Sequence, residues 1–350
     1  MGQVGMRKTV RGSAAALAIA AVTLTLTTVQ AQEFYAGKQV SVIAGTEVGG
    51  GYDLYARTLA RNIGKHIPGN PNVVVQNMPG AGGMRGANYL YAIAPKDGLT
   101  FGQIHNGLPF TKIYGDTQAQ FDPQKFIWLG SPTKEISVFL LWHTVPVNSI
   151  AEARKLDREL VLGAVGATAG GSYYSRVLTA AFGLKIKTIV GYKGLAESLL
   201  AMERGENEGY ASSFWSTLSS TREEWIKDKK IKIILRYSGD PIPGMEHVPL
   251  AEDIAENPED KMLLQIAAAP FNLGRPLAAP PGLPEDRLAI LKKAVWATLN
   301  DPSYRADCLR QKLECTSPST GEEIAGIIRR TYASPESVRK RLNEIYNTAR

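Results

Sequence analysis

The sequence lacks the short signatures that mark the commonest enzyme classes. None of the patterns HExxH, CxxC, GxSxG or the P-loop occurs in its 350 residues, and each of these patterns works by placing a particular ligand or nucleophile on a particular turn. The four histidines, His66, His105, His143 and His247, are scattered along the chain. We therefore expect no metal site and no catalytic residues.

A dense basic segment is also missing. The formal net charge is +7, but Arg7, Lys8 and Arg11 lie in the first 31 residues, which contain no acidic residue. The excess that remains is mild and spread along the chain, which argues against nucleic-acid binding. It is compatible with a weak attraction of small acidic molecules.

Cysteine is rare, with only Cys308 and Cys315 in the chain. An oxidising compartment allows a disulfide, and the spacing of these two residues leaves a disulfide and two free thiols equally open. No histidine lies near them, so the pair does not predict a metal site.

Long apolar stretches are confined to the N-terminus. After three basic residues, the uncharged segment 13–29 is rich in Ala, Leu and Val, and Val29-Gln30-Ala31 fits the small-residue cleavage pattern. We interpret residues 1–31 as a secretory signal peptide that is cut after Ala31, with a membrane anchor as the alternative. The mature protein is expected to be exported and soluble.

What the chain does contain is a series of short apolar runs, each followed by a glycine turn. The apolar fraction of 44% and the charged fraction of 21% are ordinary for a globular protein, and the length suggests two domains or one large α/β unit. Runs at 40–44 and 73–75 precede the turns GTEVGGG (45–51) and NMPGAGG (77–83), and each turn opens a helical pattern. With a third run at 100–104, this is the β-α-β-α-β order of a doubly wound lobe.

The two glycine turns predict an anion-binding site. The carboxyl ends of neighbouring parallel strands lie at the same edge of a sheet, so the turns would be side by side. A helix start carries unpaired N–H groups and a partial positive charge, and glycine lets a ligand approach the backbone closely. Asp53 either complements the helix dipole, orders the turn or contacts a ligand. His105 and Asn106 end the third strand at the same edge.

A dinucleotide site is not expected, so we predict no cofactor. The segment GAGG (80–83) departs from the dinucleotide fingerprint, and the acidic residue that should end the next strand is replaced by His105-Asn106.

The second half repeats the unit of strand, glycine turn and helix. A strand at 161–164 leads into GATAGGS (166–172), and a strand at 187–190 leads into GYKG (191–194), which predicts a second α/β lobe. Aromatic residues near these turns, among them Tyr192 and Phe214, are either packing residues or walls of a ligand cleft. The last hundred residues are mostly helical and are expected to pack on the first lobe.

Taken together, these motifs resemble a known family. The chain is similar to the periplasmic substrate-binding receptors of tripartite tricarboxylate transporters, also called the Bordetella uptake gene family. The resemblance rests on YAGK (35–38), GGGYD (49–53), NMPGAGG (77–83), APKDG (94–98), GYKG (191–194) and PPGLP (280–284). It covers essentially all of the mature chain.

The resemblance implies an α/β fold of two lobes joined by a hinge, each lobe a mainly parallel sheet flanked by helices. Residues 33–128 plus 238–350 would form the first lobe and 129–237 the second. The protein would be a periplasmic monomer that captures a small organic acid and delivers it to membrane transporter subunits. The predicted ligand-binding residues are Thr46, Glu47, Gly49, Gly50, Gly51, Tyr52, Asp53, Pro79, Gly80, Ala81, Gly82, Gly83, Asn106, Thr168, Ala169, Gly170, Ser172, Tyr192, Ser212 and Phe214.

The first turn departs from the family pattern. The family usually has a proline where this chain has Val48, and an aromatic residue where it has Thr46. Glu47 places a negative charge beside the predicted anion site. An inward-facing Glu47 would disfavour a simple polycarboxylate or would pair with a cationic group on the ligand.

Two other functions remain open from the sequence. The same cleft could serve a periplasmic sensor that docks on a membrane histidine kinase. An exported enzyme acting on an anionic substrate would use Asp53, His105 or Glu47 as its acid or base.

Overall fold

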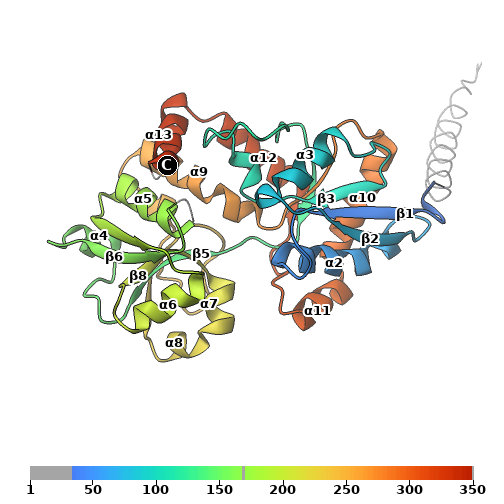
Figure 1. Cartoon of the computed structure of the whole chain (residues 1–350). Coiled ribbons are helices and arrows are strands. Elements are labelled where there is room, and N and C mark those ends of the chain that lie inside the picture. Colours follow the sequence, from blue (N-terminus) through green and yellow to red (C-terminus); the bar gives the residue numbers. More distant parts are fainter. Residues whose placement is uncertain (1–33, 168–169, 349–350) are drawn as a thin grey trace, which may run out of the picture.

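The protein folds around two separate β-sheets, seen side by side in Figure 1. The structure is a computed structural model that describes residues 34–167 and 170–348. The predicted signal peptide and the candidate residues Thr168 and Ala169 lie outside the described residues. No described helix is both long and apolar enough to cross a bilayer.

The first sheet has six strands in the order β11-β4-β10-β3-β1-β2. Strands β1, β2 and β3 pair in parallel, as predicted, and β10 and β11 pair antiparallel to their neighbours. The strands are β1 (Gln39–Ala44), β2 (Asn72–Asn77), β3 (Thr100–Gln103), β4 (Ile127–Ser131), β10 (Leu277–Ala279) and β11 (Ser319–Thr320).

The second sheet has five strands in the order β7-β6-β8-β5-β9. Strands β6, β7 and β8 are parallel, and β5 is antiparallel to both of its neighbours. The strands are β5 (Ser137–Trp142), β6 (Leu160–Ala164), β7 (Ile186–Val190), β8 (Gly209–Phe214) and β9 (Ile231–Arg236).

Both sheets are mixed, but most strands of each run in one direction, which confirms the prediction of two mainly parallel sheets. The strands that run against the rest are β5, β10 and β11. Two of them are the strands by which the chain enters a sheet after crossing from the other one, at β4 to β5 and at α9 to β10. Each crossing reaches its new sheet beside the carboxyl ends of the neighbouring strands. The entering strand therefore runs antiparallel to those neighbours.

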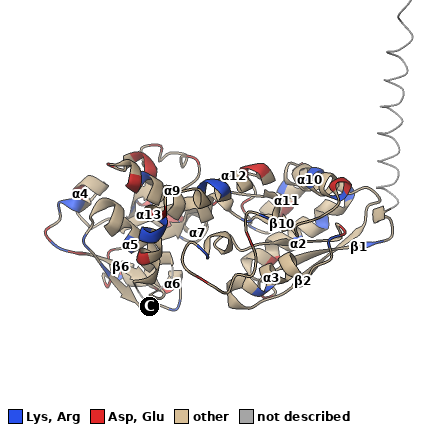
Figure 2. Ribbon diagram, turned by 90° about the horizontal axis from the view of Figure 1, so that it is seen from above, with Lys and Arg blue, Asp and Glu red and all other residues tan. Residues whose placement is uncertain are grey.

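Helices cover the sheets and connect the parallel strands. The first sheet uses α2 (Gly51–Ile63), α3 (Met84–Ala92), α10 (Glu285–Leu299), α11 (Pro302–Arg310) and α12 (Gly321–Tyr332). The second uses α4 (Ile150–Arg154), α5 (Gly170–Phe182), α6 (Leu195–Glu203), α7 (Trp215–Thr221) and α8 (Glu223–Lys227). Charged residues of both signs are interspersed along these helices over both halves of the molecule (Figure 2).

Helix α2 shows why the first half folds as the pattern predicts. Tyr55, Ala56, Leu59 and Ile63 recur at helical spacing, and all four are buried. They face β1 and β2 on one side and α10 and α11 on the other.

A disulfide joins Cys308 to Cys315, which decides the alternative that the sequence left open.

The C-terminal helices depart in part from expectation. Helices α10 and α11 pack on the first sheet's α2, as predicted. Helix α9 (Pro258–Leu273) and helix α13 (Glu336–Asn347) instead pack against α5 of the second sheet (Figure 1). One continuous core of buried side chains consequently runs from β1 through α9 to β6.

The chain crosses between the sheets at residues 131–137 and again at the end of α9. These two crossings touch: the Arg275 N–H donates to Ser131 Oγ (2.9 Å), and the Glu135 N–H donates to the Phe271 carbonyl (3.0 Å). Gly274 has φ +62°, and a Cβ there would lie 1.7 Å from the Thr133 carbonyl oxygen. Glycine is required at this contact.

Candidate functional site

The first glycine turn connects β1 to α2 and is open to solvent. Gly50 precedes the helix in an extended conformation, its N–H donates to the Glu47 carbonyl (3.2 Å), and its own carbonyl accepts from Leu54 (3.0 Å). Glu47 and Gly49 are exposed, and Val48 is 71% exposed. Val48 and Glu47 of this divergent turn thus face water, whereas Thr46 is half-buried.

The second glycine turn has an unusual backbone. Gly80, Ala81, Gly82 and Gly83 all have positive φ, between +46° and +130°. The turn is closed by a hydrogen bond from the Gly83 N–H to the Gly80 carbonyl (3.0 Å), and α3 begins directly after it. Ala81 is the one residue of these four that has a Cβ atom, so it alone is strained by a positive φ. Gly80, Ala81 and Gly82 are exposed.

The two turns pack backbone against backbone, as their predicted side-by-side position requires. A Cβ on Gly45 would lie 3.0 Å from the Gly83 Cα, and a Cβ on Gly86 would lie 3.2 Å from the Gly45 Cα. A Cβ on Gly83 would also come within 3.5 Å of the His105 Cβ. The structure therefore brings the ends of β1, β2 and β3 together.

Asp53 ties both turns to each other from below. It is 1% exposed, and it accepts hydrogen bonds from the Gly49 N–H (2.8 Å), Asn77 Nδ2 (2.8 Å) and Arg57 Nε (2.9 Å). Asn77 Nδ2 also donates to the Thr46 carbonyl (3.0 Å). Asp53 thus orders the first turn and joins it to the end of β2.

Burial on its own would raise the pKa of the Asp53 carboxyl. The hydrogen bonds from Arg57, Gly49 and Asn77 outweigh that effect, so the pKa lies below its usual range. The carboxylate is ionised at neutral pH and both of its oxygens are occupied. It follows that the Gly49 N–H is engaged within the protein.

Tyr52, in the first turn of α2, contacts the third strand end. Its hydroxyl oxygen accepts the N–H of Asn106 (2.9 Å), and its ring stacks on His105 with 4.4 Å between centroids. The Arg275 guanidinium lies 4.6 Å from the Tyr52 centroid. Partial removal of the His105 ring from water, and then repulsion from Arg275, lower the pKa of His105 to about 4, although His105 still has an exposed surface.

Arg275 also connects this cluster to the other crossing between the sheets. It forms an ion pair with Glu135 at 2.7 Å, with side-chain exposures of 18% and 4%. Sequence reasoning missed both residues, because nothing local joins two charges so far apart in the chain. The usable signal is limited to Arg275, a single charge within an apolar run, since a buried charge needs a partner. Glu135 follows Lys134 directly and gives no such signal.

The candidates of the second lobe lie at the ends of β6, β7 and β8. Ser172 Oγ donates to the Gly166 carbonyl (2.8 Å), and Ser212 Oγ bonds with Ser137 Oγ (2.9 Å). Tyr192 is half-buried, and its hydroxyl oxygen is 3.4 Å from Asn207 Nδ2. Phe214 packs edge-on against Phe271.

The two halves of the predicted site belong to different sheets. Within residues 34–167 and 170–348, no hydrogen bond joins a candidate of the first sheet (46–53, 79–83, 106) to one of the second (170–214). The same described residues contain no group of three or more His, Cys, Asp or Glu side chains that could hold a metal ion.

Comparison with known proteins places this geometry among solute receptors. The sequence model of the protein family described as "Tripartite tricarboxylate transporter family receptor" matches residues 55–340 of this chain. A curated relative, the "UPF0065 protein in gbd 5'region" of Cupriavidus necator, is 25% identical over 309 residues, covering 85% of this chain and 86% of its own.

Two solved structures share the fold. A TctC solute-binding protein from Polaromonas, without ligand, has a TM-score of 0.70 at 19% identity and covers 90% of this chain and 99% of its own. The R. palustris protein Rpa4515, solved with adipate, has a TM-score of 0.58 at 21% identity and covers 87% and 97%. These matches confirm the two-lobed binding-protein fold.

Proposed function

Because the chain belongs to the tripartite tricarboxylate transporter receptor family, whose members are periplasmic solute-binding proteins, we propose that it captures a small organic acid between its lobes. The solute would then be delivered to the membrane subunits of a transporter of that family. A dicarboxylate is the simplest candidate, since a structural neighbour is described with adipate. The predicted absence of a catalytic role is part of this proposal.

The observation that carries the proposal is the preformed pair of glycine turns. Their backbones are in contact, and the hydrogen bond from the half-buried Asn77 to the buried Asp53 holds them in place. Donors that are fixed in advance lose little conformational freedom on binding, which favours affinity. We assign the ligand's first carboxylate to the exposed segments of these turns, around Gly51 and Ala81–Gly82.

The opposing contacts would come from the second lobe. Tyr192, Ser212 and Phe214 are described candidates that retain accessible surface at the ends of β7 and β8. Closure would bring them over the first-lobe turns, and the two touching crossings would act as the hinge. We place the lobe boundaries after Ser131 and before Leu277, because β4 and β10 pair within the first sheet. A boundary between 128 and 129, as the family resemblance implies, would divide strand β4.

Asp53 gives little support to the alternative of an exported enzyme. Its two carboxylate oxygens accept hydrogen bonds from three groups of the protein, and the residue is 1% exposed, so a substrate does not reach it.

The proposal is tested by calorimetry on the mature protein with mono-, di- and tricarboxylates. We expect a saturable heat and a raised melting temperature with at least one organic acid. Stabilisation by a sugar or a cation, with none by any organic acid, would overturn the carboxylate assignment.

A further inference from the structure

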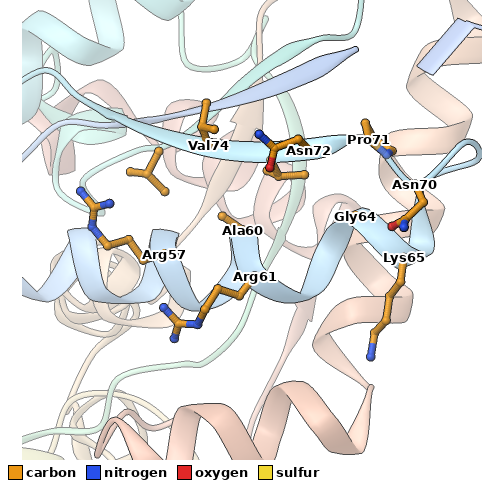
Figure 3. A pocket seen from close by; sticks show the side chains of 11 residues that line it. Arg57, Ala60, Arg61, Gly64, Lys65, Asn70, Pro71, Asn72 and Val74 are labelled. Carbon is orange, nitrogen blue, oxygen red and sulfur yellow. The ribbon is translucent and has the colours of Figure 1, made fainter. Parts of the chain in front are cut away.

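A groove lies along the outer edge of the first sheet, away from the glycine turns. Strand β2 is the edge strand of that sheet, and α2 runs beside it. Between them is a hollow of about 570 Å³, here called the edge groove (Figure 3). Its floor is formed by Val73, Val74, Val75, Ala60 and Gly64.

The backbone of β2 is open toward the edge groove. The Met78 N–H donates to the Ala44 carbonyl (2.8 Å), so Met78 faces β1. Successive residues of a strand direct their backbone groups to opposite sides. The N–H and C=O groups of Val73 and Val75 consequently point away from β1, and an edge of this kind is a template for a further strand.

Three cations form one wall of the edge groove. Arg57 and Arg61 lie on α2, and Lys65 follows at the same four-residue spacing in the short 3-10 helix Gly64–His66. None of the residues that line the hollow is acidic. Figure 3 shows these side chains along the helix beside β2.

Each of these cations has an acidic partner, but the partners lie deeper. The exposed fractions are 39% for Arg57 against 1% for Asp53, 48% for Arg61 against 10% for Asp307, and 48% for Lys65 against 15% for Asp301. The ion pairs hold the cations in place while the acids stay beneath the surface. The face presented to a partner is therefore cationic.

We propose that the edge groove docks an extended acidic segment of the membrane transporter partner, which adds to the sheet as a strand beside β2. Main-chain hydrogen bonds to Val73 and Val75 would supply affinity, and carboxylates facing Arg61 and Lys65 would set the register. The identity of the partner rests on the proposed function. A flat lipid surface fits less well, because headgroups cannot form the alternating backbone hydrogen bonds that an edge strand offers.

The probe is a capped peptide of about eight residues that alternates Glu and Thr, labelled for fluorescence anisotropy. It is compared with a Lys-Thr peptide and with a Glu-Thr peptide that is N-methylated at alternate residues, so that charge is kept and strand pairing is lost. We expect only the unmethylated acidic peptide to bind, and binding to weaken as ionic strength rises.

Two double variants test the wall. R61Q/K65Q should weaken peptide binding roughly fivefold, since exposed charge pairs contribute modestly. R204Q/K227Q, which removes an exposed arginine and an exposed lysine that are ion-paired elsewhere, should leave binding unchanged. Equal binding by R61Q/K65Q and wild type would overturn the proposal.

Amide exchange followed by NMR gives a readout that does not depend on mutation. Peptide binding should protect the amides of Val73 and Val75, and leave that of Val74, which already faces β1, unaffected. Equal binding of the N-methylated peptide, or binding to anionic phosphatidylglycerol vesicles in place of the peptide, would overturn strand addition.

The carboxylate titration separates this proposal from the previous one. R61Q/K65Q should bind the organic acid as wild type does. If the protein binds the peptide but no organic acid, the proposed solute is wrong and the docking surface stands. If it binds an organic acid but not the peptide, only the docking surface is wrong.

Discussion

The glycine turns of the two lobes look alike in sequence but are glycine-rich for different reasons. In the first lobe, Gly45 and Gly83 are in backbone contact with each other's turn. In the second lobe, a Cβ on Gly166, Gly191 or Gly194 would meet nothing within 4 Å. Gly171 of the second lobe is packed against Tyr210, at 3.0 Å from an added Cβ, so packing as such occurs in both lobes. The contact of one turn with the backbone of another distinguishes the first lobe, and under the proposed function that lobe would receive the ligand.

The largest effect is expected where the two lobes meet. Glu135→Gln leaves Arg275 without its buried counter-charge and should cost about 3 kcal/mol of the free energy of unfolding. Urea denaturation measures it. The matched control is Glu206→Gln, which breaks an exposed pair with Arg204 and should leave the free energy of unfolding nearly unchanged, since water screens such a pair. Equal costs would show that the crossing contacts do not hold the lobes together.

A smaller loss is expected at the joint between the first-lobe turns. Asp53→Ala removes the acceptor of three hydrogen bonds and should destabilise by about 2–3 kcal/mol. Ser172→Ala removes one bond from the second-lobe turn and should cost about 1 kcal/mol. Calorimetry should also show weaker organic-acid binding by Asp53→Ala. If Asp53→Ala is fully folded under the assay conditions and binds the organic acid as wild type does, Asp53 does not hold the site.

A matched pair of glycine substitutions sharpens the comparison further. Gly45→Ala forces a methyl group against the Gly83 backbone and should cost about 1–2 kcal/mol. Gly194→Ala, in extended backbone with open surroundings, should change stability by less than about 0.5 kcal/mol. Thermal unfolding of both variants measures the difference. Similar melting temperatures would contradict the distinction between packed and free turns.

The smallest effect concerns His105. Its folded-state pKa is about 4, below the usual 6.5, so between these values the unfolded chain binds a proton that the folded chain does not. Stability should therefore fall as the pH falls through this interval. The exposed surface of the ring limits the effect to about 1 kcal/mol or less. His105→Gln should flatten this part of the stability profile, and an identical profile would exclude His105 as its source.

The local parts of the site were accessible from the sequence. Apolar runs, glycine turns and helix starts predicted β1, α2, β2 and α3 and the contact between their turns, because each depends on residues close in the chain. The sequence leaves the role of Asp53 open, because Asp53 lies on α2 and its partner Asn77 lies at the end of β2, distant in the chain. The direction of β10 and the packing of α13 on α5 were also not predictable, because they depend on how distant segments dock.

The ion pair between Glu135 and Arg275 illustrates the limit most clearly. Neither residue belongs to a motif, and their pairing follows only from the two crossings lying side by side. Family resemblance predicted a hinge without saying which side chains hold it.

The disulfide leaves a chemical record of where the chain folded. The loop that it closes contains Glu314, whose N–H and carbonyl both bond to the Tyr55 hydroxyl on α2. Disulfides form in oxidising compartments and are kept reduced in the cytosol. Because Cys308 and Cys315 are the only cysteines in the chain, counting thiols in denatured protein tests the predicted export: molecules from an oxidising compartment should show no free thiol and cytosolic ones two.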